Sequence, residues 1–320
     1  MKKIIILSGD PNSINSEIIF KSWKKIGKSL KKRIYLISNY KLIKNQFKKL
    51  GYSIKVQQVK NIDESSKNDS LKVINIDLIY KNPFKVSLSS NQKFVIKCLN
   101  LGHKLSLNKN ISGIINCPIN KNLLSKTKTG VTEFFASKCR VKDNSEVMLI
   151  WNRKLAVSPV TTHLDVKDIS KKLNKQLIIK KIINIDLWFK KKFKKKPKIA
   201  VLGLNPHNAE FRKNSEERRI IIPAIKKLKN LKIKVFGPVV ADTLFINDFK
   251  NYNVIVGMFH DQVLAPFKSI FKFNAVNITL GLKYLRASPD HGVAVDLVGK
   301  NKADETSLLQ CIDVIKKFGK

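Results

Sequence analysis

The chain has 320 residues, of which 43% are hydrophobic, and its formal charge is +40. This length allows two domains or one large α/β domain with an ample core, and no apolar run approaches the roughly 20 residues that cross a bilayer. The lysines are spread over nearly every segment without interleaved aromatic residues, and lysine, asparagine and isoleucine are the residues that A/T-rich codons specify. We therefore expect neither a membrane partner nor a nucleic-acid partner.

The first predicted element is a strand, because two lysines are followed by only four strongly apolar residues before Ser8. A secretory signal would need an apolar core of about 7–15 residues. The four cysteines lie far apart and form no CxxC pair, which argues against a disulfide framework or a cysteine zinc site and indicates a reducing, cytoplasmic location. They are Cys98, Cys117, Cys139 and Cys311.

Short apolar runs then alternate with longer segments of helical spacing, which predicts an α/β fold with a largely parallel sheet. The predicted strands are Lys3–Leu7, Arg33–Ser38, Ser53–Val59, Ile111–Asn116, Leu155–Val160, Lys198–Leu204, Lys232–Phe236, Asn253–Met258 and Ala275–Thr279. The predicted helices are Ser16–Ile26, Tyr40–Leu50, Asn91–Leu105, Val166–Lys191, Ser215–Lys229 and Ser307–Phe318. The most loop-like stretch is Asn61–Lys72.

Three of the five histidines follow the carboxyl end of a predicted strand: His163, His207 and His260. In open α/β sheets, ligands bind at the carboxyl ends of the strands. Neutral imidazoles bind zinc and similar divalent ions, and three of them with an open fourth position are typical of a catalytic site. The pattern predicts a divalent metal site, although three unrelated loop histidines would give the same spacing.

A second group of polar side chains lies downstream of His260 and consists of Lys268, Asn277 and Arg286. A lysine charge, an amide and a guanidinium fork are typical of a site for a phosphate or a carboxylate. Arg286 is the most informative of the three, because arginine is scarce in this chain.

Seven segments in the same order resemble the 4-hydroxythreonine-4-phosphate dehydrogenase family. They are SGDP (Ser8–Pro11), TEFFA (Thr132–Ala136), TTHL (Thr161–Leu164), GLNPH (Gly203–His207), GPVVADTLF (Gly237–Phe245), HDQ (His260–Gln262) and the run Val276–Ser307. The resemblance implies two α/β/α domains around a mixed, largely parallel sheet, as in isocitrate and isopropylmalate dehydrogenases. Residues 1–130 plus 275–320 would bind the cofactor, residues 131–274 would bind metal and substrate and form a homodimer, and the active site would lie in the cleft between them.

The resemblance also implies an activity, namely NAD- or NADP-dependent oxidation of 4-hydroxythreonine 4-phosphate to a 3-oxo acid. That acid decarboxylates to 3-amino-2-oxopropyl phosphate, in pyridoxal phosphate biosynthesis. A divalent ion (zinc, magnesium or cobalt) would be held by His163 and His207 together with His260 of the other subunit. Asp242 or Asp261 would be the catalytic base, or would hold the substrate amine. Substrate contacts are implied for Thr132, Lys268, Asn277 and Arg286, and cofactor contacts for Gly281, Asp290, His291, Gly292 and Asp296.

The cofactor rests on the resemblance alone, because the chain has no GxGxxG motif. The chain also departs from the family pattern: Val131 stands where the family has a substrate-contacting histidine, and family glycines are missing from Gly9–Glu17 and Asn205–Arg212. These departures leave two alternatives open. One is a dehydrogenase of another four-carbon phosphorylated hydroxy acid, such as threonate or erythronate 4-phosphate, and the other is a catalytically impaired anion-binding relative.

Overall fold

The computed structural model describes residues 2–64, 69–127, 130–141 and 145–319. The chain divides into two compact units, unit 1 (Met1–Cys139 and Leu282–Lys320) and unit 2 (Arg140–Gly281). Each is an α/β unit built on a largely parallel sheet, which confirms the predicted fold class.

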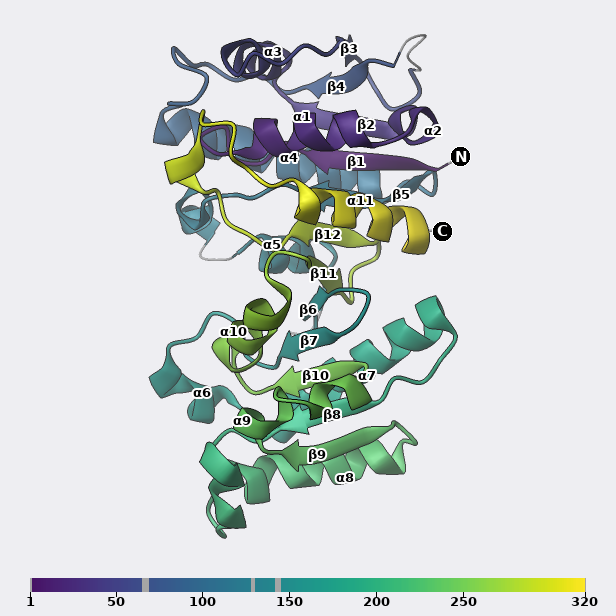
Figure 1. The fold of residues 1–320 in the computed structure, drawn as a ribbon, viewed down its shortest axis with the longest axis vertical. Helices are drawn as coiled ribbons and strands as arrows, with labels where there is room; N and C mark the ends of the chain where they lie inside the picture. Colours follow the sequence, from purple (N-terminus) through teal and green to yellow (C-terminus); the bar gives the residue numbers. More distant parts are fainter. Residues whose placement is uncertain (1, 65–68, 128–129, 142–144, 320) are drawn as a thin grey trace. The chain divides into compact units, whose positions relative to one another are not determined.

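Unit 1 has the strand order β3-β4-β2-β1-β5-β12, and its neighbouring strands pair in parallel (Figure 1). Its strands are β1 (Lys3–Leu7), β2 (Ile34–Ser38), β3 (Val56–Val59), β4 (Leu71–Asn75), β5 (Ile111–Asn116) and β12 (Arg286–Pro289). Its helices are α1 (Asn15–Lys25), α2 (Lys28–Lys31), α3 (Tyr40–Lys49), α4 (Leu88–Ser106), α5 (Val131–Lys138) and α11 (Thr306–Phe318), with 3₁₀ turns at Lys121–Thr127 and Val295–Leu297.

Strand β1 shows why this unit has helices on both faces of its sheet. Its residues Ile4–Leu7 are all buried, so both faces of the strand need apolar cover. Ile5 and Leu7 belong to an apolar cluster with Phe94 of α4, whereas Ile6 lies with residues of α1 and α11 on the other face (Figure 1). Alternation along each strand therefore separates two cores.

Unit 2 has the strand order β11-β6-β7-β10-β8-β9, in which β6 runs antiparallel to β7 and β11 and the other pairs are parallel. Its strands are β6 (Val147–Trp151), β7 (Ala156–Pro159), β8 (Ile199–Leu202), β9 (Val235–Val239), β10 (Val254–Gly257) and β11 (Val276–Leu280). Its helices are α6 (Val166–Lys172), α7 (Lys175–Phe193), α8 (Ile222–Asn230), α9 (Ala241–Leu244) and α10 (His260–Phe271), with 3₁₀ turns at Pro206–Phe211 and Asp248–Asn251 and a π-helical turn at Glu217–Ile221.

The borders between the units differ from the sequence-based borders after residues 130 and 274. Helix α5 belongs to unit 1, because Phe134 and Phe135 pack into the apolar cluster around Leu7 and Phe94. Strand β11 belongs to unit 2, because it pairs with β6 along its whole length. Both assignments depend on long-range packing that a pattern along the chain does not contain.

The predicted helix Val166–Lys191 is two helices, α6 and α7. Leu173 is extended, and the side chain of Asn174 accepts a hydrogen bond of 2.9 Å from the amide of Leu177. An asparagine that caps a new helix in this way satisfies a free amide at the helix start. The apolar spacing continues through the break, which is why periodicity alone predicted one helix.

Strands β4, β6 and β12 and helices α5 and α10 were not predicted as separate elements. Strand β4 begins inside the stretch Asn61–Lys72 that the sequence analysis interpreted as a loop, and residues 65–68 of that stretch lie outside the described residues. Helix α10 contains Pro266, which is unfavourable in a helix interior and hides the helical pattern.

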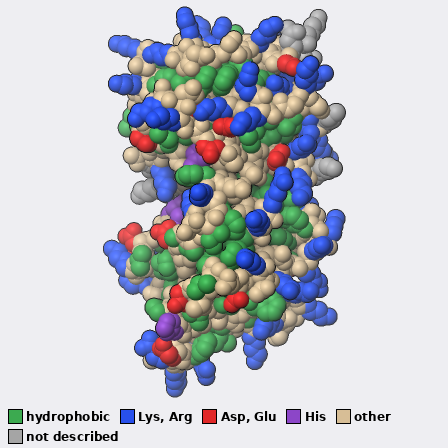
Figure 2. Space-filling view, viewed as in Figure 1, with side chains coloured by type: hydrophobic (Ala, Val, Ile, Leu, Met, Phe, Trp, Pro, Cys, Tyr) green, Lys and Arg blue, Asp and Glu red, His purple; other side chains and the backbone are tan. Residues whose placement is uncertain are grey.

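Lysine and arginine side chains are scattered over the face shown in Figure 2, in both units. This scattered distribution agrees with the interpretation that the net charge of +40 follows from the amino-acid composition. In the described part of the chain, no helix is both long and apolar enough to cross a bilayer.

Candidate active site

The three candidate metal ligands of unit 2 follow three neighbouring parallel strands. His163 comes after β7, His207 after β8, and His260 is the first residue of α10 after β10. Strand β10 pairs in parallel with both β7 and β8, so all three histidines lie at the carboxyl edge of the sheet. The sequence pattern had predicted this edge as the place for a ligand site.

Within one chain, His163 and His260 lie close to each other, whereas His207 lies beside Asp242. The rings of His163 and His260 lie with their centroids 6.0 Å apart. The Nε2 atom of His207 lies 3.8 Å from Oδ2 of Asp242, and both side chains are well exposed. Oδ1 of Asp261 lies 2.7 Å from Nδ1 of His260. Each predicted base thus lies beside a predicted metal ligand.

The metal site stays a prediction on this geometry. Among the described residues of one chain, no group of three or more histidine, cysteine, aspartate or glutamate side chains is arranged to hold a metal ion. His163 and His260 supply two nitrogen donors of the kind that zinc and cobalt accept. A complete ligand set needs at least one donor more than this pair provides.

Glu217 holds the loop that carries His207, although sequence analysis gave it no role. Its buried Oε1 accepts hydrogen bonds of 2.8 Å from the amides of Leu204 and Asn205. Burial acts to raise the pKa of this carboxyl, but the hydrogen bonds from Asn205 and Leu204 outweigh it, so that the pKa lies below its usual value. An ionised carboxylate therefore fixes the end of β8.

The loop itself takes a left-handed turn from His207 to Phe211, with φ between 44° and 58°. Left-handed conformation costs non-glycine residues roughly 1–2 kcal/mol each. Family glycines are missing from this segment, and the turn forms without them. The strain is concentrated beside a candidate metal ligand, where strained backbone often serves function.

Gln262 ties the ends of two strands together. Its Nε2 donates to the carbonyl of Gly203 at 2.7 Å, and its Oε1 accepts from the amide of Met258 at 2.6 Å. This link joins the exits of β8 and β10, the two strands that His207 and His260 follow. The HDQ motif contained this residue, but a pattern cannot show which backbone groups an amide will bridge.

In unit 1, Arg286 is the centre of a buried polar cluster. Its Nε donates to Oδ1 of Asn116 at 2.7 Å, its Nη1 donates to Oγ1 of Thr132 at 3.0 Å, and its guanidinium lies 5.9 Å from the ring centroid of Phe135. Burial lowers the pKa of Arg286 to about 10, while the charge of Glu133 opposes the shift. The structure therefore brings together two predicted substrate residues, Thr132 and Arg286.

The other two predicted substrate residues belong to unit 2. Lys268 lies in α10, and Asn277 lies on β11. Among the described residues, the buried Oδ1 of Asn277 has no hydrogen-bond partner. An amide oxygen of this kind can accept a hydrogen bond from a ligand.

The predicted cofactor residues lie mainly in the segment between β12 and α11 of unit 1. The amide of Asp290 donates to Oγ of Ser307 at 2.9 Å, and Nδ1 of His291 lies 2.9 Å from the carbonyl of Gly292. Asp296 is exposed in a 3₁₀ turn, whereas Gly281 ends unit 2 with φ +90°. The segment is thus an ordered loop with exposed backbone at Gly292.

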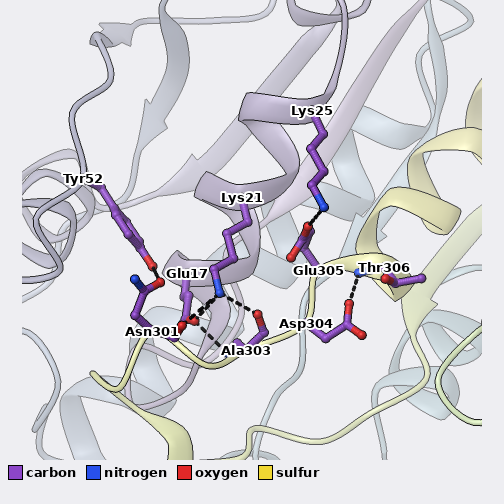
Figure 3. Close-up of polar contacts among 9 residues, drawn as sticks. All are labelled: Glu17, Lys21, Lys25, Tyr52, Asn301, Ala303, Asp304, Glu305 and Thr306. Atoms are coloured by element: carbon purple, nitrogen blue, oxygen red, sulfur yellow. Dashed lines mark hydrogen bonds and ion pairs between the residues drawn. The ribbon is translucent and has the colours of Figure 1, made fainter.

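Polar contacts fasten the end of this segment to α1 (Figure 3). Oε1 of buried Glu17 accepts from the amide of Ala303 at 2.6 Å and from Nζ of Lys21 at 2.8 Å, and Lys21 also donates to the carbonyl of Ala303 at 2.8 Å. The hydroxyl of Tyr52 bonds Oδ1 of Asn301. Sequence reasoning missed this anchor, although Glu17 stood in the motif-bearing stretch Gly9–Glu17.

Asparagines hold the loop after β1 in place of the missing glycines. The side chain of Asn12 both donates to and accepts from the backbone of Val86, at 2.9 and 2.8 Å. Nδ2 of Asn15 donates to the carbonyls of Ser8 and Pro118 at 2.9 and 2.8 Å. The loop keeps one left-handed residue, Gly9, where a Cβ would meet the carbonyl of Pro118 at 2.5 Å.

Comparisons with known proteins place these features in a family context. The family model described as pyridoxal phosphate biosynthetic protein PdxA matches residues 30–315. The chain is 36% identical to 4-hydroxythreonine-4-phosphate dehydrogenase of Sulfurihydrogenibium sp. over 98% of this chain and 97% of that protein, and 37% identical to the enzyme of Aquifex aeolicus over 98% of each. The crystal structure of 4-hydroxythreonine-4-phosphate dehydrogenase from Klebsiella pneumoniae is similar with a TM-score of 0.86, at 27% identity over 99% of this chain and 98% of that one.

Proposed function

The chain belongs to the family of the pyridoxal phosphate biosynthetic protein PdxA, and from this premise we propose that it oxidises 4-hydroxythreonine 4-phosphate with NAD or NADP. The product would be a 3-oxo acid, which loses carbon dioxide to give 3-amino-2-oxopropyl phosphate. The observation that carries the proposal is the arrangement of His163, His207 and His260 at one edge of the unit 2 sheet, in a chain that matches these dehydrogenases from end to end.

His163, His207 and His260 would hold a divalent ion (zinc, magnesium or cobalt) in a homodimer whose metal ligands come from both subunits. Such an ion acts as a Lewis acid that makes a secondary alcohol easier to deprotonate. In this assignment His163 and His207 belong to one subunit and His260 to the other, and its support is that His163 and His207 lie at the same edge of the unit 2 sheet and offer imidazole nitrogen donors.

Asp261 and Asp242 are the two candidates for the group that takes the alcohol proton. Asp261 lies against His260 and Asp242 lies near His207, so each carboxylate is beside a proposed ligand. Arg286, with Thr132 beside it, would bind and orient the substrate phosphate or carboxylate, together with Lys268 and Asn277. In this proposal the role of the buried Arg286 is to hold the substrate in place for the reaction.

The loop with Asp290, His291, Gly292 and Asp296 would bind the cofactor, with Gly281 contributing from the end of unit 2. Glu17, Lys21 and Tyr52 hold the end of this loop in place (Figure 3). A loop that is already held in place loses less conformational entropy when it binds a ligand, and this supports the proposal. We also propose a cytoplasmic location, which agrees with four free, buried cysteines among the described residues.

The test is a steady-state assay of NADH formation from 4-hydroxythreonine 4-phosphate. Activity should disappear on chelation, return when one divalent ion is added back, and fall at least a hundredfold in His260→Ala. His103→Ala is the matched control, because His103 is the one histidine outside the predicted set and its Nδ1 lies 2.9 Å from the hydroxyl of Tyr284 in unit 1. Full turnover in excess chelator, with no metal detected by elemental analysis, would refute the metal-dependent mechanism.

A second candidate function is oxidation of another four-carbon phosphorylated hydroxy acid, such as threonate or erythronate 4-phosphate. The observation that favours it is Val131, which begins α5 directly before Thr132, the partner of Arg286. Valine offers no hydrogen bond where the family has a histidine. The two candidate functions are distinguished by measuring kcat/KM for a panel of these substrates with the unaltered chain and with Val131→His. If the unaltered chain prefers another substrate and Val131→His shifts the preference toward 4-hydroxythreonine 4-phosphate, the second function is favoured.

A further inference from the structure

Unit 2 contains a cavity of about 260 Å³ at the edge of the sheet opposite the histidines. Its walls come from the turn between β6 and β7, the end of α7 and the segments that lead into β8 and β10. These segments precede parallel strands, whereas His163, His207 and His260 follow them (Figure 1). The cavity is therefore separate from the candidate active site.

The walls of the cavity are aromatic. The rings of Phe189 and Phe193 are stacked with centroids 5.1 Å apart, and Trp151 lies 6.4 Å from Phe193 with its ring tilted by 38°. Trp151 and Phe189 are buried, while Phe193 is half-buried. Flat π surfaces of this kind favour offset stacking of another aromatic ring.

The rim of the cavity is cationic. Arg153, Lys154, Lys195 and Lys196 line it and are exposed, and no carboxylate is among the lining residues. Four cationic residues therefore lie beside the aromatic rings that line the cavity. Such a site attracts an anion, and its cations can also interact with π-systems.

Two asparagines add donors whose orientation is already fixed. Oδ1 of Asn152 accepts from the amides of Lys154 and Leu155 at 2.8 and 2.9 Å, and Oδ1 of Asn253 accepts from the amide of Lys198 at 2.8 Å. Because the oxygens are engaged, the Nδ2 groups are oriented the other way. In the described part of the chain they have no hydrogen-bond partner, so they are free to donate to a ligand.

We propose that this cavity binds a flat heteroaromatic monophosphate. The ring would stack against Phe193 and Trp151, the phosphate would lie toward Arg153 and Lys154, and the asparagine amides would donate to ring or phosphate oxygens. The carbonyl end of α7 disfavours an anion near Phe193, which is why the phosphate belongs at the turn. The volume lies below the roughly 300–1,000 Å³ of most ligand pockets, which favours one ring with one phosphate over a dinucleotide.

The test is isothermal titration calorimetry of the full chain with pyridoxine 5′-phosphate. This probe has the required ring and phosphate and lacks an aldehyde, which would react with the many lysines. AMP, pyridoxine and inorganic phosphate are titrated alongside. We expect one phosphorylated ring per cavity, with at least tenfold weaker binding of pyridoxine and of inorganic phosphate. Equal binding of inorganic phosphate, or no binding of either phosphorylated ring, would overturn the proposal.

Variants show whether the bound probe occupies this cavity. Arg153→Gln/Lys154→Gln should weaken binding at least tenfold, and Phe193→Ser should do the same. The matched control, Lys226→Gln/Lys227→Gln on α8, makes the same change of charge at exposed residues outside the cavity and should bind normally. Unchanged binding in both cavity variants would assign the probe to another site and reject the inference.

Discussion

Lys72 provides the sharpest stability prediction, because it is a buried cation on β4, a strand with a neighbour on each side. Its side chain on β4 is 1% exposed and lies with Nζ 4.5 Å from the ring centroid of Tyr35. Nζ donates at 2.7 Å to the carbonyl of Lys32, just after α2. Burial, with a smaller effect of the charge on Lys3, lowers the pKa of Lys72 from 10.5 to about 8.

The lowered pKa makes the folded state more stable at high pH. Below pH 8, Lys72 is protonated in both states and the folded chain bears the full cost of the buried charge. Between pH 8 and 10.5 the unfolded chain binds more protons, so the free energy of unfolding rises with pH. At about 1.4 kcal/mol per pKa unit, the fall from 10.5 to about 8 corresponds to a gain of about 3 kcal/mol.

The assay is urea unfolding of the unaltered chain and of Lys72→Met at several pH values from 7 to 10.5. Trp151→Phe and Trp188→Phe in both proteins leave Trp23 as the fluorophore, so the signal reports unit 1. The free energy of unfolding of the Lys72 protein minus that of Lys72→Met should rise by about 3 kcal/mol over this range.

The difference between two proteins cancels the titration of the other lysines. Lys48→Met, at an exposed position of α3, is the matched control and should give a flat difference. A difference for Lys72→Met that stays constant within about 0.5 kcal/mol would refute the reasoning, because it would mean that Lys72 has the same pKa in both states.

Three further predictions concern the candidate site. Ala209→Gly should raise the free energy of unfolding in urea by about 1 kcal/mol, because Ala209 has φ +51°, which glycine adopts without strain. The control is Ala224→Gly inside α8, which should lower the free energy of unfolding by about as much. The same effect in both variants would contradict the strain argument. Gln262→Leu leaves the carbonyl of Gly203 and the amide of Met258 without the Gln262 side chain as a partner. We therefore expect the free energy of unfolding in urea to fall by about 2 kcal/mol and kcat to decrease. Unchanged values of both would show that the bridge is dispensable. Arg286→Lys should raise KM at least tenfold in steady-state kinetics, with a smaller change in kcat. The reason is that an ammonium group cannot reproduce both hydrogen bonds that the guanidinium donates to Asn116 and Thr132. An unchanged KM would rule out a role of Arg286 in substrate binding.

The sequence predicted the elements whose patterns are local. Strands β1 and β5 have the predicted bounds, because each is a short apolar run between polar residues. Strand β4 was missed because it lies next to a polar stretch, and α5 because its apolar face is short. Phe135 of α5 is buried because residues that are distant in sequence, such as Leu7 and Phe94, pack around it.

The site was predictable to a similar extent. His163, His207 and His260 could be placed at one sheet edge because each follows a strand, and the order of motifs identified the family. Gln262 could not be assigned, because it bonds the carbonyl of Gly203, which becomes its neighbour only after β8 and β10 pair. Glu217 could not be assigned either, because it bonds the amide of Leu204, 13 residues earlier, which only the fold of the loop brings near.

By itself, the amino-acid sequence determined the α/β class, the family and the residue types available for chemistry, since spacing and motif order are properties of the chain alone. Tertiary structure alone decided that His163 faces His260, that Arg286 lies between Asn116 and Thr132, and that Lys72 is buried against Tyr35. The physical reason is that burial and hydrogen bonding depend on which strands become neighbours, and the strand order joins residues that are far apart along the chain.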